Sequence, residues 1–127
     1  MKKLLQIVLV SSLSFLCFSC YYDEIPEHIL NPSEIPTDPT DPNYVEIELS
    51  SSIQPIFTAN CIGCHNENRD PDLREGNSYN ALIPDYVISE DADVSKLITV
   101  VSSGHGGLSI EEIGLLKAWI NQGAKNN

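Results

Sequence analysis

Two cysteines and the histidine that follows them stand in a spacing that suits covalent attachment of a flat macrocycle. They occur in the run Cys61-Ile62-Gly63-Cys64-His65. This Cys-x-x-Cys-His pattern is the signature of c-type haem attachment. Two thiols separated by two residues reach the two vinyl groups on one edge of a porphyrin, and the next residue then lies under the iron. We therefore predict one covalent haem c, held by thioethers from Cys61 and Cys64, with His65 as the proximal iron ligand.

Three other chemistries use a closely spaced pair of cysteines. A structural zinc site needs four Cys or His ligands, and His28 and His105 are the remaining histidines available to complete it. A redox dithiol is expected in a βαβ pattern, whereas this sequence has the pattern of a helical domain. A disulfide between Cys61 and Cys64 suits an oxidising compartment, but its small ring constrains little of the unfolded chain and leaves His65 without a role. Haem attachment explains all three residues of the motif.

The helix that carries the motif is expected to begin at Ser51 or Ser52, to have Pro55 in its first turn and to end at about Cys61. Hydroxyl side chains favour the N-cap, and proline is tolerated in the first turn because an N–H there has no helical partner. The alternation over residues 45–49 is compatible with a strand or with an extended lead-in. Other strand signals are few, so the predicted fold class is all-α.

The last helix has the clearest signals. Ser109 and Glu112 form a capping box, and Gly123 marks the stop. An apolar stripe recurs between them at helical spacing: Ile110, Ile113, Leu116, Trp119 and Ile120.

A middle helix is predicted over residues 94–101, with Asp93 as its cap. Its apolar face consists of Val94, Leu97, Ile98 and Val101. A short helical turn is expected at 78–82.

The first residues predict export from the cytoplasm. Met1–Lys3 is a short basic start, and residues 4–18 form an apolar run that is shorter than the roughly 20 residues needed to span a bilayer. This run fits a secretory signal peptide over residues 1–19. Ser19-Cys20 resembles the lipobox of bacterial lipoproteins, which implies a lipid on Cys20; the alternative is an ordinary cleavage that leaves a free thiol. The expected location is the cell envelope, anchored by lipid to a membrane outside the cytoplasm.

Residues 20–45 are predicted to form this lipid anchor and an acidic, proline-rich tether, and residues 46–127 form the haem domain. The tether prolines are Pro26, Pro32, Pro36, Pro39 and Pro42. Proline lacks a donor and favours extended neighbours, and the segment has few apolar residues to bury. We therefore expect it to be extended and solvated.

The charge of the chain restricts its partners. The formal net charge is −11, and cleavage after residue 19 removes Lys2 and Lys3, which leaves −13. No basic stripe remains to bind nucleic acid. Electrostatic steering favours a positively charged partner protein. The predicted domain is also short enough to need a cofactor or staple for stability.

From Ile53 to Ala124 the chain resembles the small cytochrome-c-like domains of bacterial envelope lipoproteins, often called planctomycete-type cytochrome c domains. The matching pieces are Ile53-Gln54-Pro55-Ile56-Phe57, Asn60-Cys61-Ile62-Gly63-Cys64-His65, and Leu108-Ser109 through Trp119-Ile120-Asn121-Gln122-Gly123-Ala124. The resemblance implies an all-α cytochrome c fold, in which the first and last helices cross around one covalent haem. In that packing Phe57 meets Leu115, Leu116 or Trp119, and Gly114 permits close approach.

The sequence departs from that family at the distal iron ligand. The family usually supplies a Met-Pro motif before the last helix, but the only methionine here is Met1, which leaves with the signal peptide. Gly104-His105-Gly106-Gly107 stands at the corresponding place. Flanking glycines let the backbone approach a flat ring and adopt positive φ, so we predict bis-histidine ligation by His65 and His105.

Other arrangements at the distal position stay open. His105 is alternatively an exposed turn residue or a partner of a haem propionate, with the iron five-coordinate or bound to water. The remaining candidate ligands are His28, Lys96 and an asparagine. Arg69 and Arg74 are candidates to pair with propionates, although solvated loop charges are the simpler interpretation, and Tyr79 and Tyr86 are candidates to line the haem crevice.

The expected function is one-electron transfer with a redox partner protein. Six-coordinate iron leaves no position for a substrate, so we expect no enzymatic activity. The alternative is a haem module that binds or senses a small gas through an open or labile sixth position.

Overall fold

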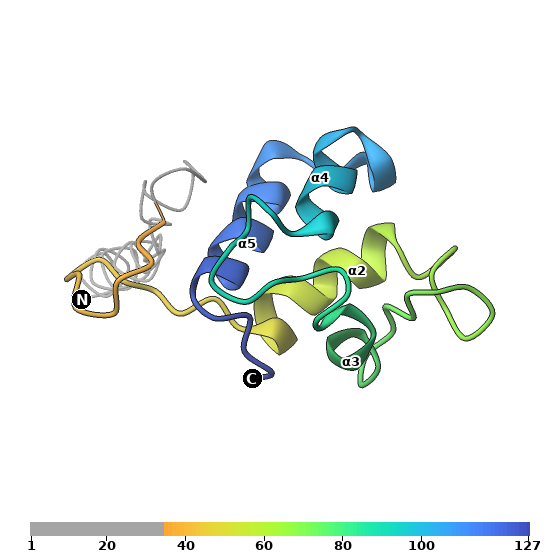
Figure 1. Cartoon of the computed structure of the whole chain (residues 1–127), viewed down its shortest axis with the longest axis horizontal. Helices are drawn as coiled ribbons and strands as arrows, with labels where there is room; N and C mark the ends of the chain where they lie inside the picture. The colour runs from red at the N-terminus through yellow and green to blue at the C-terminus, as the bar shows by residue number, and fades with distance from the viewer. Residues whose placement is uncertain (1–34) are drawn as a thin grey trace, which may run out of the picture.

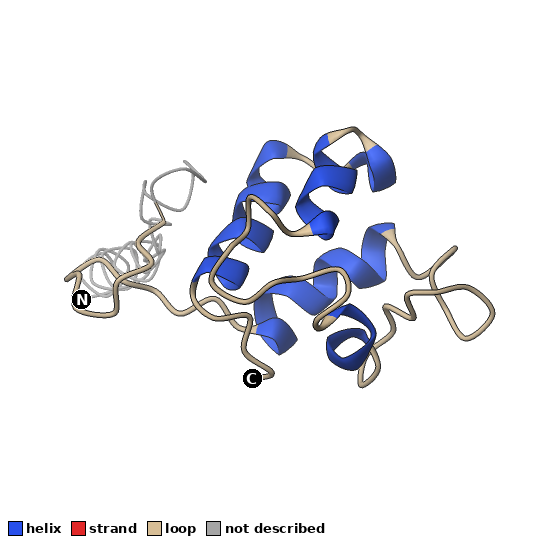
Figure 2. Ribbon diagram, viewed as in Figure 1, coloured by secondary structure: helices blue, strands red, loops and turns tan. Residues whose placement is uncertain are grey.

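The computed structural model describes residues 35–127 of the chain. Within them every regular element is a helix and no strand is present, which confirms the predicted all-α class (Figure 2). An isolated antiparallel bridge joins Ile88 to Asp91. The predicted signal peptide, Cys20 and His28 lie outside the described residues.

The first helical segment begins with a π-helical turn, η3 (Leu49–Ile53), and continues as α2 (Gln54–Asn60). The residues before it have no strand partner and form the extended lead-in. The prediction of a hydroxyl cap at Ser51 or Ser52 was wrong, because the helix begins earlier and the Ser51 hydroxyl instead donates to Glu48 at 2.8 Å. Pro55 lies in the first turn of α2 as predicted, and Cys61 is the C-cap.

The next helices are α3 (Ser78–Leu82), which coincides with the predicted turn, and α4 (Lys96–Ser102). The predicted start of α4 at Val94 was wrong: Val94 is 59% exposed and Ser95 is the N-cap. Ser95 is fully buried, and its hydroxyl accepts a hydrogen bond from the Ile88 N–H at 2.9 Å and donates to the Asp91 carbonyl at 2.7 Å. These bonds hold the chain in a turn up to residue 95.

Asp93 does not cap α4 as the sequence analysis expected. Its carboxylate instead lies 3.4 Å from the ammonium group of Lys117. The other part of the prediction was correct, because Ile98 and Val101 are buried on one face of α4.

A three-residue 3₁₀ turn, η4 (His105–Gly107), precedes the last helix, α5 (Ile110–Asn121). The capping box is confirmed: the Ser109 hydroxyl accepts from the Glu112 N–H at 3.2 Å, and the Glu112 carboxylate accepts from the Ser109 N–H at 2.8 Å. Gly123 has φ +106° just after the helix, as expected for a stop.

Ile110 does not belong to the buried stripe of α5, because its side chain is 76% exposed. Residues six apart lie about 120° apart around a helix, so Ile110 points well away from Leu116, which is fully buried. Trp119 and Ile120 are also fully buried, and Ile113 is partly buried against the same core.

The core gathers around Trp119 of α5 and Phe57 of α2, whose side chains are 0% and 1% exposed. The Trp119 indole N–H donates to the carbonyl of Lys125 at 3.0 Å. α5 packs against α4 and against η3. Figure 1 shows the C-terminus beside the start of the first helical segment, where the Ser50 N–H donates to the carbonyl of Asn127 at 3.0 Å.

The end of the predicted tether contacts the domain at Pro36 and Val45, while most of residues 37–45 are exposed. The side-chain amide of Gln122, just after α5, donates to the carbonyls of Pro36 and Val45 at 3.0 Å each. Its oxygen accepts from the Ile47 N–H at 2.7 Å. A single amide group thus satisfies three backbone groups of the lead-in and holds it in place.

Candidate functional site

A cavity of about 240 Å³ brings together the four described residues that the sequence analysis assigned to a haem: Cys61, Cys64, His65 and His105. We refer to it as the central cavity. Its apolar walls come from the loop after α2, from α3 and from α4: Pro71, Leu73, Leu82, Leu97, Val100 and Val101. Such a space, mostly apolar with a few converging polar groups, is typical of a ligand site.

The Cys-x-x-Cys-His motif continues α2 as a series of tight turns. The Cys61 N–H donates to the Phe57 carbonyl at 2.9 Å, and the Cys64 and His65 N–H groups donate to the Cys61 carbonyl at 3.0 and 2.9 Å. These bonds keep the backbone coiled past the end of the helix. As a result both thiols and the imidazole line the same cavity.

Both thiols are free in the structure. Cys61 is half-buried and Cys64 is exposed. Burial raises the pKa of the Cys61 thiol above its ordinary value, and the negative charge of Glu112 raises it further. Reactive and redox-active cysteines have lowered pKa values because a nearby positive charge or helix N-terminus stabilises the thiolate. The surroundings of Cys61 therefore disfavour a redox dithiol.

The zinc alternative needs four converging ligands. Within residues 35–127, no three side chains of His, Cys, Asp or Glu converge to hold a metal ion. An iron in a porphyrin takes at most two ligands from the protein, so the lack of a three-residue cluster among these residues does not conflict with haem.

The imidazoles of His65 and His105 lie with their ring centres 5.8 Å apart and their planes at 73°. Two imidazoles that bind one metal from opposite sides, each through a metal–nitrogen bond of about 2 Å, have ring centres roughly 6 Å apart. The fold thus places two residues from distant parts of the sequence at a spacing that suits one shared iron.

The loop around His105 depends on its glycines. Gly104, Gly106 and Gly107 have φ values of +94°, +80° and +66°, which confirms the positive φ predicted for this segment. L-residues with a side chain rarely adopt these values. A Cβ atom on Gly106 would also lie 2.9 Å from Cδ1 of Leu108. Glycine at these positions therefore lets the loop that carries His105 adopt its conformation without the strain that a side chain would add.

The side chain of His65 has one unsatisfied polar atom. Its Nδ1 is buried and has no hydrogen-bond partner. A histidine that binds a metal usually donates its other ring N–H to a carboxylate, a carbonyl or water, and Nδ1 of His65 has no such partner among the described residues.

A hydrogen bond between two helices fixes the start of the motif. The Asn60 amide, at the end of α2, donates to the Glu112 carboxylate on α5 at 3.1 Å and to the Ile56 carbonyl at 3.2 Å. The same carboxylate is part of the capping box with Ser109. Glu112 therefore ties the residue before Cys61 to the first turn of α5, which follows the His105 loop.

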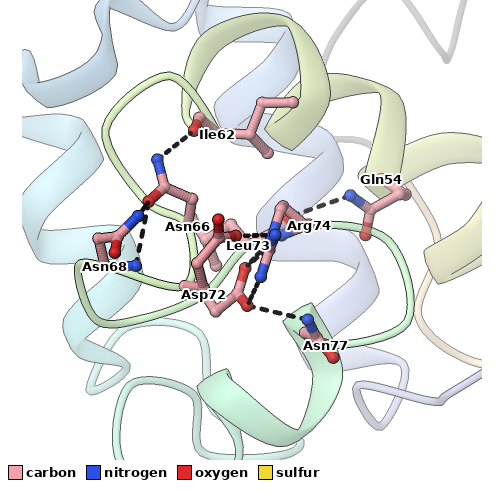
Figure 3. Close-up of polar contacts among 9 residues, drawn as sticks. Gln54, Ile62, Asn66, Asn68, Asp72, Leu73, Arg74 and Asn77 are labelled. Atoms are coloured by element: carbon pink, nitrogen blue, oxygen red, sulfur yellow. Dashed lines mark hydrogen bonds and ion pairs between the residues drawn. The ribbon is translucent and has the colours of Figure 1, made fainter.

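The structure distinguishes between the arginine and tyrosine residues that were suggested as further contacts of a haem. Arg69 and Tyr86 line the central cavity, whereas Arg74 does not. Figure 3 shows Arg74 held by Asp72, with their closest atoms 2.8 Å apart. Tyr79 borders a different and smaller cavity.

Lys96, an alternative iron ligand, does not line the central cavity. Its ammonium group lies over the ring of Tyr86, 4.6 Å from the ring centre. The apolar residues of the loop after α2 that line the cavity, Pro71 and Leu73, had no recognisable sequence signal, because loop side chains have no periodicity to mark the buried face.

Comparison with protein-family models, with curated proteins and with solved structures finds no match for this chain. Among the described residues, no helix combines the length and apolar character required to cross a membrane.

Proposed function

We propose that this chain is a membrane-tethered, mono-haem c-type cytochrome whose function is one-electron transfer. The observation that carries the proposal is the convergence of Cys61, Cys64, His65 and His105 on one apolar cavity, with the two imidazoles 5.8 Å apart. Sequence spacing alone accounts for the first three residues. The fourth comes from a distant loop and reaches the same space.

The residues present fit a haem. Cys61 and Cys64 supply the two thiols for covalent attachment, and His65 and His105 supply an imidazole each. The cavity, at about 240 Å³, is smaller than a typical ligand pocket of roughly 300–1,000 Å³. A macrocycle held there would leave one edge outside the protein, and Cys64, which is exposed, lies at that opening.

When bound, the haem supplies an iron that changes between two oxidation states by one electron. The chain contributes a dry, apolar surrounding from Leu73, Leu82 and Val101, which limits the access of water. With haem bound, His65 and His105 would both hold the iron and would leave it no free position for a substrate. Electron transfer through the exposed edge is therefore favoured over chemistry on a bound molecule.

The finer fold proposal is a cytochrome c arrangement in which the first and last helical segments cross. It is supported by the packing of α5 against η3 and by the burial of Phe57 and Trp119 in one core. Gly114 is buried in α5, as expected where another element approaches closely.

The proposed setting is the cell envelope, with a lipid on Cys20 as the anchor. The acidic charge of the chain favours a redox partner with a positive surface. The exposed edge near Cys64 is the proposed point of contact with that partner.

The test is to express the whole chain in a host that matures c-type cytochromes. The intact mass should rise by one haem, and the pyridine haemochrome spectrum should be that of a haem with two thioether bonds. A chain of which Cys61 and Cys64 are both replaced by alanine should carry no covalent haem. Wild-type protein recovered with free thiols and no haem would overturn the proposal.

A second function, binding of a small gas, is favoured by the position of His105. This side chain is exposed and belongs to a three-residue turn, so few contacts hold it in place. A ligand that dissociates readily would open the sixth position. Rapid and complete binding of carbon monoxide to the reduced protein supports gas binding, whereas slow or absent binding supports electron transfer.

A further inference from the structure

Among residues 35–127, Arg69 is the only Lys, Arg, Asp or Glu that lines the central cavity. The other lining residues are apolar or uncharged apart from the thiols, the imidazoles and the Tyr86 phenol. A single guanidinium at the edge of an apolar space is suited to an occupant that is mainly apolar but carries an acidic group.

Arg69 and Arg74 belong to the same loop but have different surroundings. Arg74 forms ion pairs with Asp72 and Glu67, and its guanidinium contacts Asp72 through two nitrogens at 2.9 and 2.8 Å (Figure 3). Arg69 forms no ion pair with any carboxylate of residues 35–127. Its side chain is exposed, and its charge is available to a ligand.

We propose that Arg69 binds a propionate carboxylate of the haem, an inference that rests on the proposed function. A guanidinium matches a carboxylate through two parallel hydrogen bonds. Because Arg69 is at the rim, the carboxylate would stay partly hydrated, and the desolvation cost of the ion pair would be small. Arg74 already binds its carboxylates within the chain and has no such role.

This assignment orients the macrocycle in the cavity. Cys61 and Cys64 fix the edge that carries the vinyl groups, and Arg69 fixes an edge that carries a propionate. A positive charge beside the haem also stabilises the reduced iron relative to the oxidised iron. Arg69 therefore raises the reduction potential compared with a neutral residue at the same position.

The test compares the mature haem protein with three variants: R69Q, R69K and R74Q. The readout is the propionate bending band in the resonance Raman spectrum, which moves to lower frequency when the carboxylate loses hydrogen bonds. R69Q should lower this frequency and lower the reduction potential. R69K keeps the charge but not the two parallel bonds, so it should lower the frequency and leave the potential near that of the wild type. R74Q should leave the Raman band unchanged.

An R69Q or R69K band identical to that of the wild type would overturn the assignment of Arg69, as would an equal shift in R74Q. Should R69Q fail to mature, R69K decides the question by itself. These outcomes differ from failure of the proposed function, in which the wild-type chain carries no haem.

Discussion

His65 and His105 both line the central cavity, with ring centres 5.8 Å apart and ring planes at 73°. They are the two histidines of the described residues. His65 follows the end of α2, and His105 opens a turn before α5. The pairing depends on the packing of the helices, and it is the basis for the first prediction.

Replacing His105 by alanine should convert a low-spin haem spectrum to a high-spin one, because the iron loses its second imidazole. His105→Met should instead keep a low-spin spectrum and raise the reduction potential, since a thioether favours reduced iron more than an imidazole does. Ser103→Ala, on the same loop, is the control and should leave the spectrum unchanged. Unchanged Soret and α bands in His105→Ala would exclude His105 as a ligand.

Replacing Gly106 by alanine should weaken the binding of His105 to the iron. Alanine at φ +80° costs about 1–2 kcal/mol, and its Cβ would press against the Leu108 side chain. The low-spin fraction, measured by optical spectroscopy, should fall. Gly63→Ala is a matched control within the haem motif, because a Cβ there has no neighbour within 4 Å and φ is not positive. Equal spectra for the two variants would show that the loop has no such constraint.

The bond between Asn60 and Glu112 should contribute a measurable coupling free energy between α2 and α5. In a double-mutant cycle, Asn60→Ala and Glu112→Ala should be non-additive by about 0.5–1 kcal/mol, as expected for a partly exposed hydrogen bond to a charged group. The measurement is denaturant unfolding of the haem protein. A parallel cycle with Glu111→Ala should be additive, because no hydrogen bond joins Glu111 to Asn60. Additivity in both cycles would mean that the bond has no role in stability.

In the haem-free chain, Cys61 should be alkylated more slowly than Cys64 at any pH at which the fraction of ionised thiol limits the reaction rate. Burial and the charge of Glu112 raise the pKa of Cys61, so a smaller fraction is ionised at a given pH. Mass spectrometry of the two labelled cysteines over a pH series gives the two rates. Glu112→Gln should accelerate the reaction of Cys61 by removing the electrostatic part of the effect. Equal rates in folded protein would contradict the described burial of Cys61.

The elements that the sequence predicted correctly depend on local chemistry. The capping box of Ser109 and Glu112, the stop at Gly123 and the positive φ of Gly104 and Gly106 all follow from interactions within a few residues. The same is true of the short helix α3.

The errors arose where residues outside the predicted element decide the outcome. Ser95 begins α4 because it binds Ile88 and Asp91, which no pattern at positions 94–101 shows. The lead-in lies against the domain because Gln122 binds it from far along the chain. The same holds for the candidate site. The residue spacing predicted the cysteine motif, and the flanking glycines pointed to His105. Pro71 and Leu73 could be identified as cavity-lining residues only from the three-dimensional structure.

The hydrogen bonds from Gln122 to Pro36 and Val45 have a mechanical consequence. A force on the chain at Pro36 is shared between the covalent path to α2 and, through Gln122, the C-terminal end of α5. The segment that leads into Cys61 therefore bears less of that force than it would without the Gln122 side chain.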